Sequence, residues 1–325
     1  MTMRILLAGG AGYIGSRLAP ELADHGYEVS VIDLLWFGNH MSSSVPVVRK
    51  DLFECTVEEL RNFDQIVFLA GLSNDPMAEF DPARNFVQNG ALPAYLAFVA
   101  KQAGVRRMVY ASSCSVYGYT ADKLYDETCP VTCAYPYGIS KLQGERAAFQ
   151  LQDEDFSVIS LRQGTVCGWS PRMRFDLIVN TMFKTALTTG TITVNNPAIW
   201  RPVLDIRDTV AAFVRAVQTS TSVSGIFNVA SGNFTVGQVA DDVRDAVEEE
   251  TGSRPRLEIR DIADIRNYKV ATERARIELG FEPQRSIKDI VRELFSHREE
   301  FGDFERDEFY NIREFRKLPK VSAIG

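Results

Sequence analysis

Tyr137 and Lys141 stand four residues apart in the stretch Tyr-Gly-Ile-Ser-Lys, a spacing that places both side chains on one face of a helix. A phenol with its ordinary pKa of about 10 is a poor base at neutral pH. An ammonium group beside the phenol favours the charged phenolate, so we expect Lys141 to lower the pKa of Tyr137. The pair alone is a weak signal, because a packing aromatic followed by a solvated lysine has the same spacing.

The usual acid–base and metal-binding residues are few. The histidines, His25, His40 and His297, lie in no motif, which leaves acid–base work to Tyr, Lys or carboxylates. Cys129 and Cys133 lack a His or a further Cys to complete a ligand set, so we expect no metal. The five cysteines stand at positions 55, 114, 129, 133 and 167, with no obvious disulfide framework, and are interpreted as free thiols of a reducing cytosol.

A glycine-rich turn follows the first predicted strand. Residues 4–8 form a short apolar run typical of a buried parallel strand, and a helical pattern follows the turn as far as residue 23. A glycine turn at a helix N-terminus lets backbone N–H groups approach a pyrophosphate, assisted by the helix dipole. We therefore expect a dinucleotide site formed by Gly9, Gly12, Tyr13, Ile14 and Gly15.

Asp33 ends the second predicted strand, 18 positions after Gly15. A carboxylate at this point accepts hydrogen bonds from the adenosine ribose and repels a 2′-phosphate. Residues 34–39 contain no Arg or Lys that would attract that phosphate. The sequence favours NAD over NADP as the cofactor.

Strands and helices alternate across residues 4–165, which predicts an α/β fold with a Rossmann-type, doubly wound parallel sheet. One predicted strand ends in Ala70 and Gly71, whose small size allows a cofactor to approach closely. Ser73 and Asn74 follow at the strand edge where ligands bind in such sheets. Residues 82–103 are predicted to form one long helix.

The pattern changes beyond residue 169. We predict helices opening at 172–180 and spanning 208–218, 236–252 and 286–299, and strands at 191–194 and 225–229. The expected domains are an NAD-binding domain at 1–168, to which 201–230 return, a smaller and mainly substrate-binding α/β lobe at 169–315, and a tail at 316–325.

Composition excludes several classes of protein. The chain of 325 residues has a net charge of −7 and contains no basic block, so nucleic acid is not an expected partner. No apolar run reaches the roughly 18 residues of a membrane span. The first residues enter a predicted strand without a signal-peptide pattern, and we expect a cytoplasmic protein.

The glycine turn, Asp33, Ser113, the Tyr137–Lys141 pair and Arg201 occur in an order that resembles the extended short-chain dehydrogenase/reductase superfamily. The similarity is greatest to its NAD-dependent nucleotide-sugar epimerase/dehydratase branch and covers about residues 3–300. It implies a nucleoside-diphosphate sugar as substrate and NAD as cofactor.

The resemblance implies a role for each matching residue. Ser113 would hydrogen-bond the reacting sugar hydroxyl, Tyr137 would be the base, and Lys141 would also hold the nicotinamide ribose. Asp51 and Leu52 would contact adenine, and Asn89 would support the site. The implied substrate-binding residues are Ser73, Asn74, Ser115, Thr165, Leu177, Asn180, Arg201, Arg266 and Tyr268, with Leu177 and Asn180 at the nucleobase and Arg201 and Arg266 at the diphosphate.

Two departures from the family pattern bear on the reaction. Cys114 and Ser115 stand where 4,6-dehydratases carry an Asp-Glu pair, and neither is a carboxylic acid. Thr165 stands where galactose 4-epimerases often have Asn, so the sugar and the nucleobase stay open. We expect epimerisation, most simply at C4, with hydride passing to NAD and back. The alternatives are a 4-dehydrogenase or ketoreductase, a 4,6-dehydratase, and a cofactor-sensing protein without catalysis.

The family often forms dimers through helices that correspond to residues 85–103 and 137–151. Both segments carry apolar residues, among them Ala94, Phe98, Ala147 and Leu151, and we expect a homodimer. The alternative is that these residues face the sheet.

Overall fold

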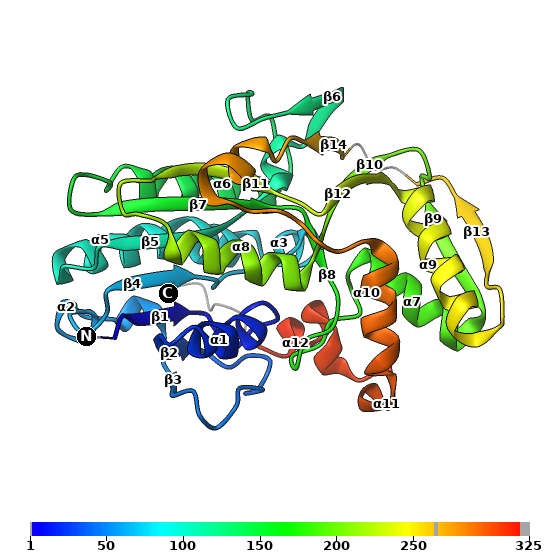
Figure 1. Cartoon of the computed structure of the whole chain (residues 1–325), viewed down its shortest axis with the longest axis horizontal. Helices are drawn as coiled ribbons and strands as arrows, with labels where there is room; N and C mark the ends of the chain where they lie inside the picture. The colour runs from blue at the N-terminus through cyan, green and yellow to red at the C-terminus, as the bar shows by residue number, and fades with distance from the viewer. Residues whose placement is uncertain (1, 263–265, 319–325) are drawn as a thin grey trace, which may run out of the picture.

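The computed structural model describes residues 2–262 and 266–318, and its centre is a parallel sheet of seven strands in the order β11-β7-β5-β4-β1-β2-β3 (Figure 1). Every neighbouring pair in it is parallel. The strands are β1 (Arg4–Ala8), β2 (Glu28–Asp33), β3 (Val47–Arg49), β4 (Gln65–Phe68), β5 (Arg107–Ser113), β7 (Ser157–Gln163) and β11 (Gly225–Val229). The predicted Rossmann-type sheet is confirmed.

Helices cover both faces of this sheet because its strands are apolar on both sides. In β1, Ile5 and Leu7 pack into one hydrophobic cluster with α1 (Gly15–Asp24) and α8 (Ile206–Gln218). Leu6 and Ala8 alternate with them and pack into a second cluster, with α5 (Leu92–Ala103) on the opposite face. The period of two along the strand therefore produces two cores from one run of apolar residues. The second face also carries α2 (Val57–Leu60) and α6 (Pro136–Phe149).

The helix predicted at 82–103 has three parts. It begins as α4 (Pro82–Phe86), continues through a π-helical turn, η2 (Val87–Ala91), and ends as α5. Gly104, in the left-handed region at φ +84°, terminates it. The π turn contains Asn89, which is fully buried.

The second lobe has its own apolar core between helices and small sheets, to the right of the main sheet in Figure 1. Its strands are β8 (Thr165–Cys167), β10 (Trp200–Asp205) and β12 (Gly232–Thr235) in one sheet, and β9 (Thr191–Asn195) and β13 (Arg256–Arg260) in another. Its helices are α7 (Ile178–Thr189), α9 (Val236–Thr251), α10 (Ile287–Ser296) and α11 (Arg298–Phe301). Thus α8 and β11 belong to the main layer, whereas β10 lies in the smaller sheet.

The prediction that residues 172–180 open a helix is wrong, because α7 begins only at Ile178. The preceding residues are held by long-range and side-chain contacts instead. The backbone N–H of Phe175 donates to the carbonyl of Phe309 at 3.0 Å, and the Arg174 guanidinium binds the carboxylate of Asp176. Residues 172–177 therefore form an irregular segment that faces the main sheet edge.

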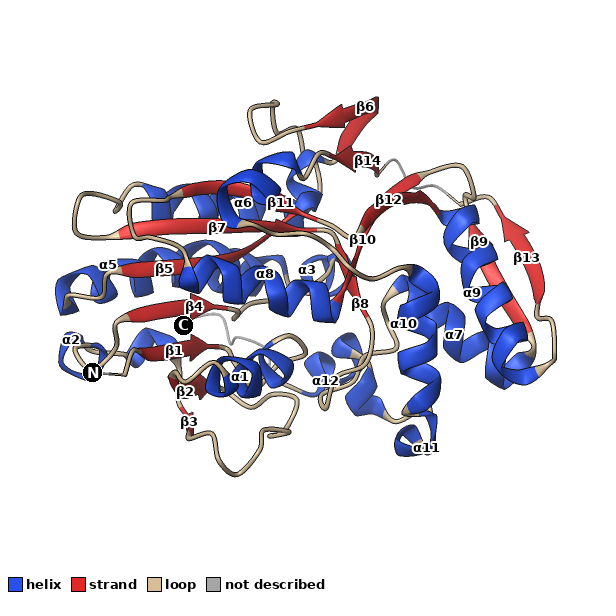
Figure 2. Cartoon of the chain, in the orientation of Figure 1, coloured by secondary structure: helices blue, strands red, loops and turns tan. Residues whose placement is uncertain are grey.

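The remaining elements are short. They are η1 (Leu52–Glu54), α3 (Asp75–Phe80), η3 (Cys114–Tyr117), β6 (Tyr119–Tyr125), β14 (Asn267–Val270), η4 (Ala275–Leu279), η5 (Asp307–Phe309) and α12 (Asn311–Lys317). β6 and β14 pair in parallel and stand apart from the main sheet (Figure 2). α12 lies where the two lobes meet.

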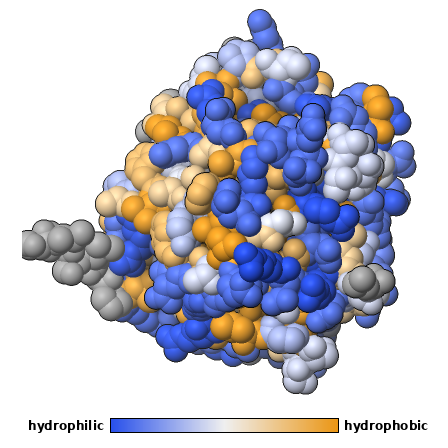
Figure 3. Space-filling model, turned by 90° about the vertical axis from the view of Figure 1, so that its left-hand side faces the viewer, coloured by the Kyte–Doolittle hydropathy of each residue, from blue (hydrophilic) through white to orange (hydrophobic). Residues whose placement is uncertain are grey.

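Figure 3 looks onto the end of the molecule that is on the left in Figure 1, where polar and apolar side chains are interspersed. Within residues 2–262 and 266–318, no helix has the length and apolar character needed to cross a bilayer. The same described residues contain no cluster of His, Cys, Asp or Glu that could hold a metal ion.

Candidate active site

A cavity of about 530 Å³ opens between the carboxyl edge of the main sheet and the second lobe. It is of the size typical for small-molecule sites, and its position is the one expected for ligands in such sheets. The predicted site residues that line it are Gly9, Gly12, Tyr13, Ile14, Gly15, Asp33, Asp51, Leu52, Ala70, Gly71, Ser73, Asn74, Ser113, Ser115, Tyr137, Thr165, Leu177, Arg201, Arg266 and Tyr268. Asn89, Lys141 and Asn180 do not line it.

The glycine turn forms one wall of the cavity and leads into α1. A Cβ on Gly9 would lie 2.4 Å from Cα of Ala70, and a Cβ on Gly15 would lie 2.1 Å from the carbonyl oxygen of Gly10, so backbone fills both places. A Cβ on Gly12 would instead meet nothing closer than the Gly9 carbonyl oxygen at 3.6 Å. Gly12 thus leaves open space in the cavity that another side chain would occupy.

Asp33 sits at the end of β2 with its carboxylate tied to the glycine turn. Oδ2 accepts from the backbone N–H of Ala11 at 3.0 Å, and Oδ1 accepts from that of Leu35 at 2.7 Å. Burial raises the pKa of Asp33, while these two hydrogen bonds oppose the rise. Leu35 has a positive φ of 57°, a conformation rare outside glycine, which turns the chain sharply after the strand.

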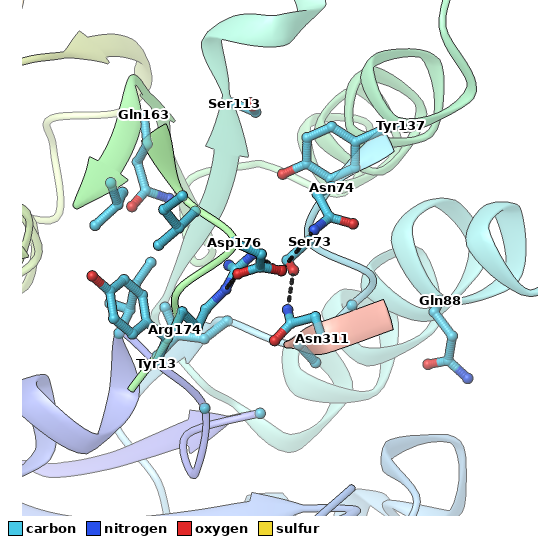
Figure 4. A pocket seen from close by; sticks show the side chains of 18 of the residues that line it. Tyr13, Ser73, Asn74, Gln88, Ser113, Tyr137, Gln163, Arg174, Asp176 and Asn311 are labelled. Atoms are coloured by element: carbon cyan, nitrogen blue, oxygen red, sulfur yellow. Dashed lines mark hydrogen bonds and ion pairs between the residues drawn. The ribbon is translucent and has the colours of Figure 1, made fainter. Parts of the chain in front are cut away.

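Ser113, Ser115 and Tyr137 converge on the other side of the cavity. Ser113 is the last residue of β5, and its Oγ lies 2.6 Å from Oγ of Ser115. Tyr137 stands in the first turn of α6, which starts at Pro136, and its phenol points into the space between Asn74 and the second lobe (Figure 4). A hydrogen bond from the Ser113 side chain lowers the pKa of Tyr137.

The expectation that Lys141 lowers the pKa of Tyr137 is not met here. Burial raises the pKa of Tyr137 to about 12, and Arg174 rather than Lys141 is the cation that opposes this rise. Lys141 is itself buried, with Nζ 4.6 Å from the centre of the Tyr110 ring, and burial lowers its pKa to about 7. With its pKa this close to neutrality, Lys141 carries only part of a positive charge at pH 7 in the protein without ligand.

Asn89 and Asn180 hydrogen-bond to other parts of the protein and do not line the cavity. Asn89 Nδ2 donates to the Leu72 carbonyl at 2.9 Å and to Ser140 Oγ at 3.2 Å, linking the loop after β4 to α6. Asn180 Oδ1 accepts from the Gly168 backbone N–H at 3.0 Å, and its Nδ2 donates to the carbonyl of Arg174 at 2.8 Å. Asn180 is fully buried, so it holds the 168–174 segment in place, which differs from the predicted nucleobase contact.

Two arginines and a tyrosine line the far side. Arg201, on β10, has its guanidinium 5.6 Å from the ring centre of Tyr268, and it also hydrogen-bonds the carbonyl oxygen of Arg266. Arg266 forms an ion pair with Asp75 at the start of α3. These contacts place two arginines, one of them ion-paired with Asp75, on the part of the cavity nearest the second lobe.

The polar cavity residues that sequence reasoning missed include Arg172, Arg174, Asp176 and Asn311. Asp176 joins Arg174, through bonds of 2.8 and 3.1 Å, to Asn74, through a bond of 3.2 Å (Figure 4). The available signal was the charged stretch directly after the strand at 165–167, since residues at strand carboxyl ends approach ligands. Asn311 had no such signal, because it lies more than 100 residues further along the chain.

Comparison with known proteins agrees with this geometry. The sequence profile of the NAD dependent epimerase/dehydratase family matches residues 5–230. The chain belongs to this family. NAD is therefore its cofactor, and the site fits NAD: the glycine turn leaves space at Gly12, Asp33 stands at the β2 end, and Arg172 Nε has no partner among the described residues.

Individual relatives in this family are distant. UDP-glucose 4-epimerase of Corynebacterium glutamicum is 26% identical over 330 residues, which cover 93% of this chain and 97% of that protein. UDP-glucose 4-epimerase of Neisseria gonorrhoeae is 29% identical over 176 residues, and the match spans only 52% of that relative and 49% of this chain. Among solved structures, MoeE5 in complex with UDP-glucose and NAD is 27% identical, with a TM-score of 0.79 over 91% of this chain and 99% of that one.

Proposed function

We propose that this chain is an NAD-dependent nucleoside-diphosphate-sugar epimerase, acting most simply at C4. The observation that carries the proposal is that one cavity is lined by Ser113 and Tyr137, by the glycine turn, and by Arg201 and Arg266. A sugar whose diphosphate lies at those arginines would present its ring to the Tyr137 phenol. The named 4-epimerase relatives support the same assignment.

The residues have complementary tasks in this reaction. When bound, NAD supplies a reversible acceptor for a hydride from the sugar ring carbon. Tyr137 takes the proton of the sugar hydroxyl and later gives it back. Ser113 hydrogen-bonds the phenol oxygen of Tyr137 and the oxygen of that sugar hydroxyl. Arg201 and Arg266 hold the diphosphate while the keto sugar turns its other face to the cofactor. Because proton and hydride both return, there is no net oxidation.

The surroundings of Cys114 support a reaction without loss of water. Cys114 is fully buried, its thiol donates to the carbonyl of Arg162 at 3.1 Å, and burial raises its pKa. It therefore cannot protonate a leaving hydroxyl at the sugar. Ser115 reaches the cavity but carries an ordinary alcohol, a poor proton donor at neutral pH.

The decisive experiment incubates the purified protein with UDP-, GDP-, CDP- and TDP-sugars without added reductant, and analyses products by mass spectrometry and NMR. A new stereoisomer of unchanged mass supports the proposal. A loss of about 18 mass units, one water, would favour a dehydratase, and stoichiometric NADH release with loss of two hydrogens would establish a dehydrogenase.

Two further properties belong to the proposal. We infer a homodimer through α5 and α6, since Phe98 on α5 is 51% exposed although it is a large apolar residue. Analytical ultracentrifugation of Phe98→Glu tests this, because the substitution should yield monomers. A cytoplasmic location agrees with the five cysteines, which are all free thiols.

A further inference from the structure

Arg172 is a buried cation with almost no partners. Its side chain is 2% exposed, and among the described residues it makes one hydrogen bond, from Nη2 to Oδ1 of Asn311 at 2.5 Å. Its Nε has no hydrogen-bond partner within those residues. Burying a guanidinium without a directly paired carboxylate is costly, so the arrangement suits an anion that arrives with a ligand.

The position of Arg172 identifies the part of the cavity that this anion would occupy. Its charge interacts most strongly with Arg174 and Asp176 in its own segment, and also with Tyr13 in the glycine turn and Asp33 at the end of β2. Its guanidinium lies 4.0 Å from the ring centre of Phe37, in the loop after β2. Asp33 and the glycine turn flank the site of the adenosine diphosphate half of the cofactor, whereas Arg201 and Arg266 line the opposite wall.

Asn311, at the start of α12, ties Arg172 to the main sheet across the cavity. While Oδ1 accepts from Arg172, Nδ2 donates to Oγ of Ser73 in the loop after β4 at 2.5 Å (Figure 4). Asn311 and its neighbour Ile312 both line the cavity, and Asn311 is only 4% exposed. One amide thus bridges two loops that approach the cavity from different lobes.

The rest of α12 is anchored by aromatic packing. Phe315 is 2% exposed and its ring centre lies 5.9 Å from that of Trp36 and 6.0 Å from that of Phe80. Trp36 follows Asp33 in the chain and itself lines the cavity. The C-terminal segment 307–318 therefore spans the region beside the cofactor's adenosine half.

We propose that residues 307–318 form a cofactor clasp, in which Asn311 positions Arg172 against the diphosphate of NAD and slows cofactor release. The clasp binds the cofactor and not the sugar. It rests on NAD binding alone, so its failure would leave the proposed epimerase reaction untouched.

The test measures NADH binding by fluorescence and NADH dissociation by stopped-flow displacement in three variants. Arg172→Met removes the charge but keeps a long side chain, and Asn311→Ala removes the bridge. Arg61→Met is the matched control, since it removes an exposed guanidinium that pairs with Glu58 and lies outside both the cavity lining and residues 307–318. UDP affinity is measured in parallel.

We expect Arg172→Met to weaken NADH binding about tenfold or more and to reduce its salt dependence, because a charged hydrogen bond is lost. Asn311→Ala should speed NADH dissociation by a similar factor, with UDP affinity unchanged in both variants and wild-type behaviour in the control. Wild-type NADH kinetics in Asn311→Ala, or weakened UDP with normal NADH, would overturn the clasp. Should Arg172→Met not fold, Asn311→Ala decides the question, provided that it melts like the wild type.

Discussion

The ammonium group of Lys141 lies over the ring of Tyr110, with Nζ 4.6 Å from the ring centre. The Tyr110 hydroxyl donates to the Lys141 carbonyl at 3.2 Å, which closes the apolar side of this pocket. In this setting the pKa of Lys141 falls to about 7. The lysine is thus poised to change charge near neutral pH in the protein without ligand.

This shift predicts a pH dependence of stability. Between about pH 7 and the ordinary lysine pKa of about 10.4, the unfolded chain holds the Lys141 proton and the folded chain does not, so the free energy of unfolding rises with pH. Lys141→Met should remove this contribution. Thermal melts of wild type, Lys141→Met and the surface control Lys123→Met at pH 7, 8 and 9 check it. Melting temperatures that change with pH in the same way for all three proteins would contradict the prediction.

Tyr137→Phe should remove the proton acceptor while keeping the ring. We expect turnover of the responsive nucleotide sugar to fall by about 10²–10⁴-fold with little change in melting temperature, as for loss of a general base. Because burial raises the pKa of Tyr137 to about 12, wild-type kcat/KM should also increase from pH 7 to pH 9 as more phenolate forms. The control is Tyr119→Phe, whose ring is 52% exposed. Normal turnover in a folded Tyr137→Phe would exclude this role.

Two glycines of the same turn should respond differently to alanine. Gly12→Ala places a methyl group in open space 3.6 Å from the nearest backbone oxygen, so we expect normal folding but at least tenfold weaker NADH binding. Gly15→Ala would set Cβ 2.1 Å from the Gly10 carbonyl oxygen, and we expect loss of folded protein. Circular dichroism and NADH titration separate the two effects. Equal stability of both variants would contradict this description of the turn.

The ion pair beneath α6 should be important for stability. Glu145 on α6 and Arg162 on β7 are almost fully buried and joined at 2.6 and 3.1 Å. Glu145→Ala leaves an unpaired buried guanidinium, which typically costs about 3–5 kcal/mol. Urea unfolding measures this, with Glu58→Ala as the control, because the exposed Glu58–Arg61 pair contributes at most about 1 kcal/mol. Similar losses of unfolding free energy in Glu145→Ala and Glu58→Ala would contradict the expected difference between the buried and the exposed ion pair.

The sequence predicted the main sheet well because the residues that determine its strands and turns are neighbours in the chain. The apolar run at 4–8, the glycines that follow it and the acidic end of β2 each occupy consecutive positions, and the structure has them as β1, the turn and Asp33. The long helix at 82–103 was recognised by its apolar pattern, which does not reveal a π turn inside it.

The features that the sequence did not predict depend on contacts between segments that are distant in the chain. Residues 172–177 form no helix because Phe175 is bonded to Phe309, and no periodicity in the sequence records that bond. The pKa relationship of Tyr137 and Lys141 was misjudged for the same reason. The spacing of four predicts that the side chains of Tyr137 and Lys141 lie close together on a helix. The ammonium of Lys141 instead packs over the ring of Tyr110, which lies on β5.

The π turn Val87–Ala91 holds one residue more than a turn of regular α-helix needs. An α-helix turns about 100° per residue, so deleting a residue from an uninterrupted helix rotates everything beyond it by roughly that angle. Deleting one residue here can instead convert the π turn into an α turn, which leaves Asn85 before it and Leu92 and Leu96 after it able to face inward as they do now. This helix should therefore tolerate the loss of one residue better than its uninterrupted neighbours.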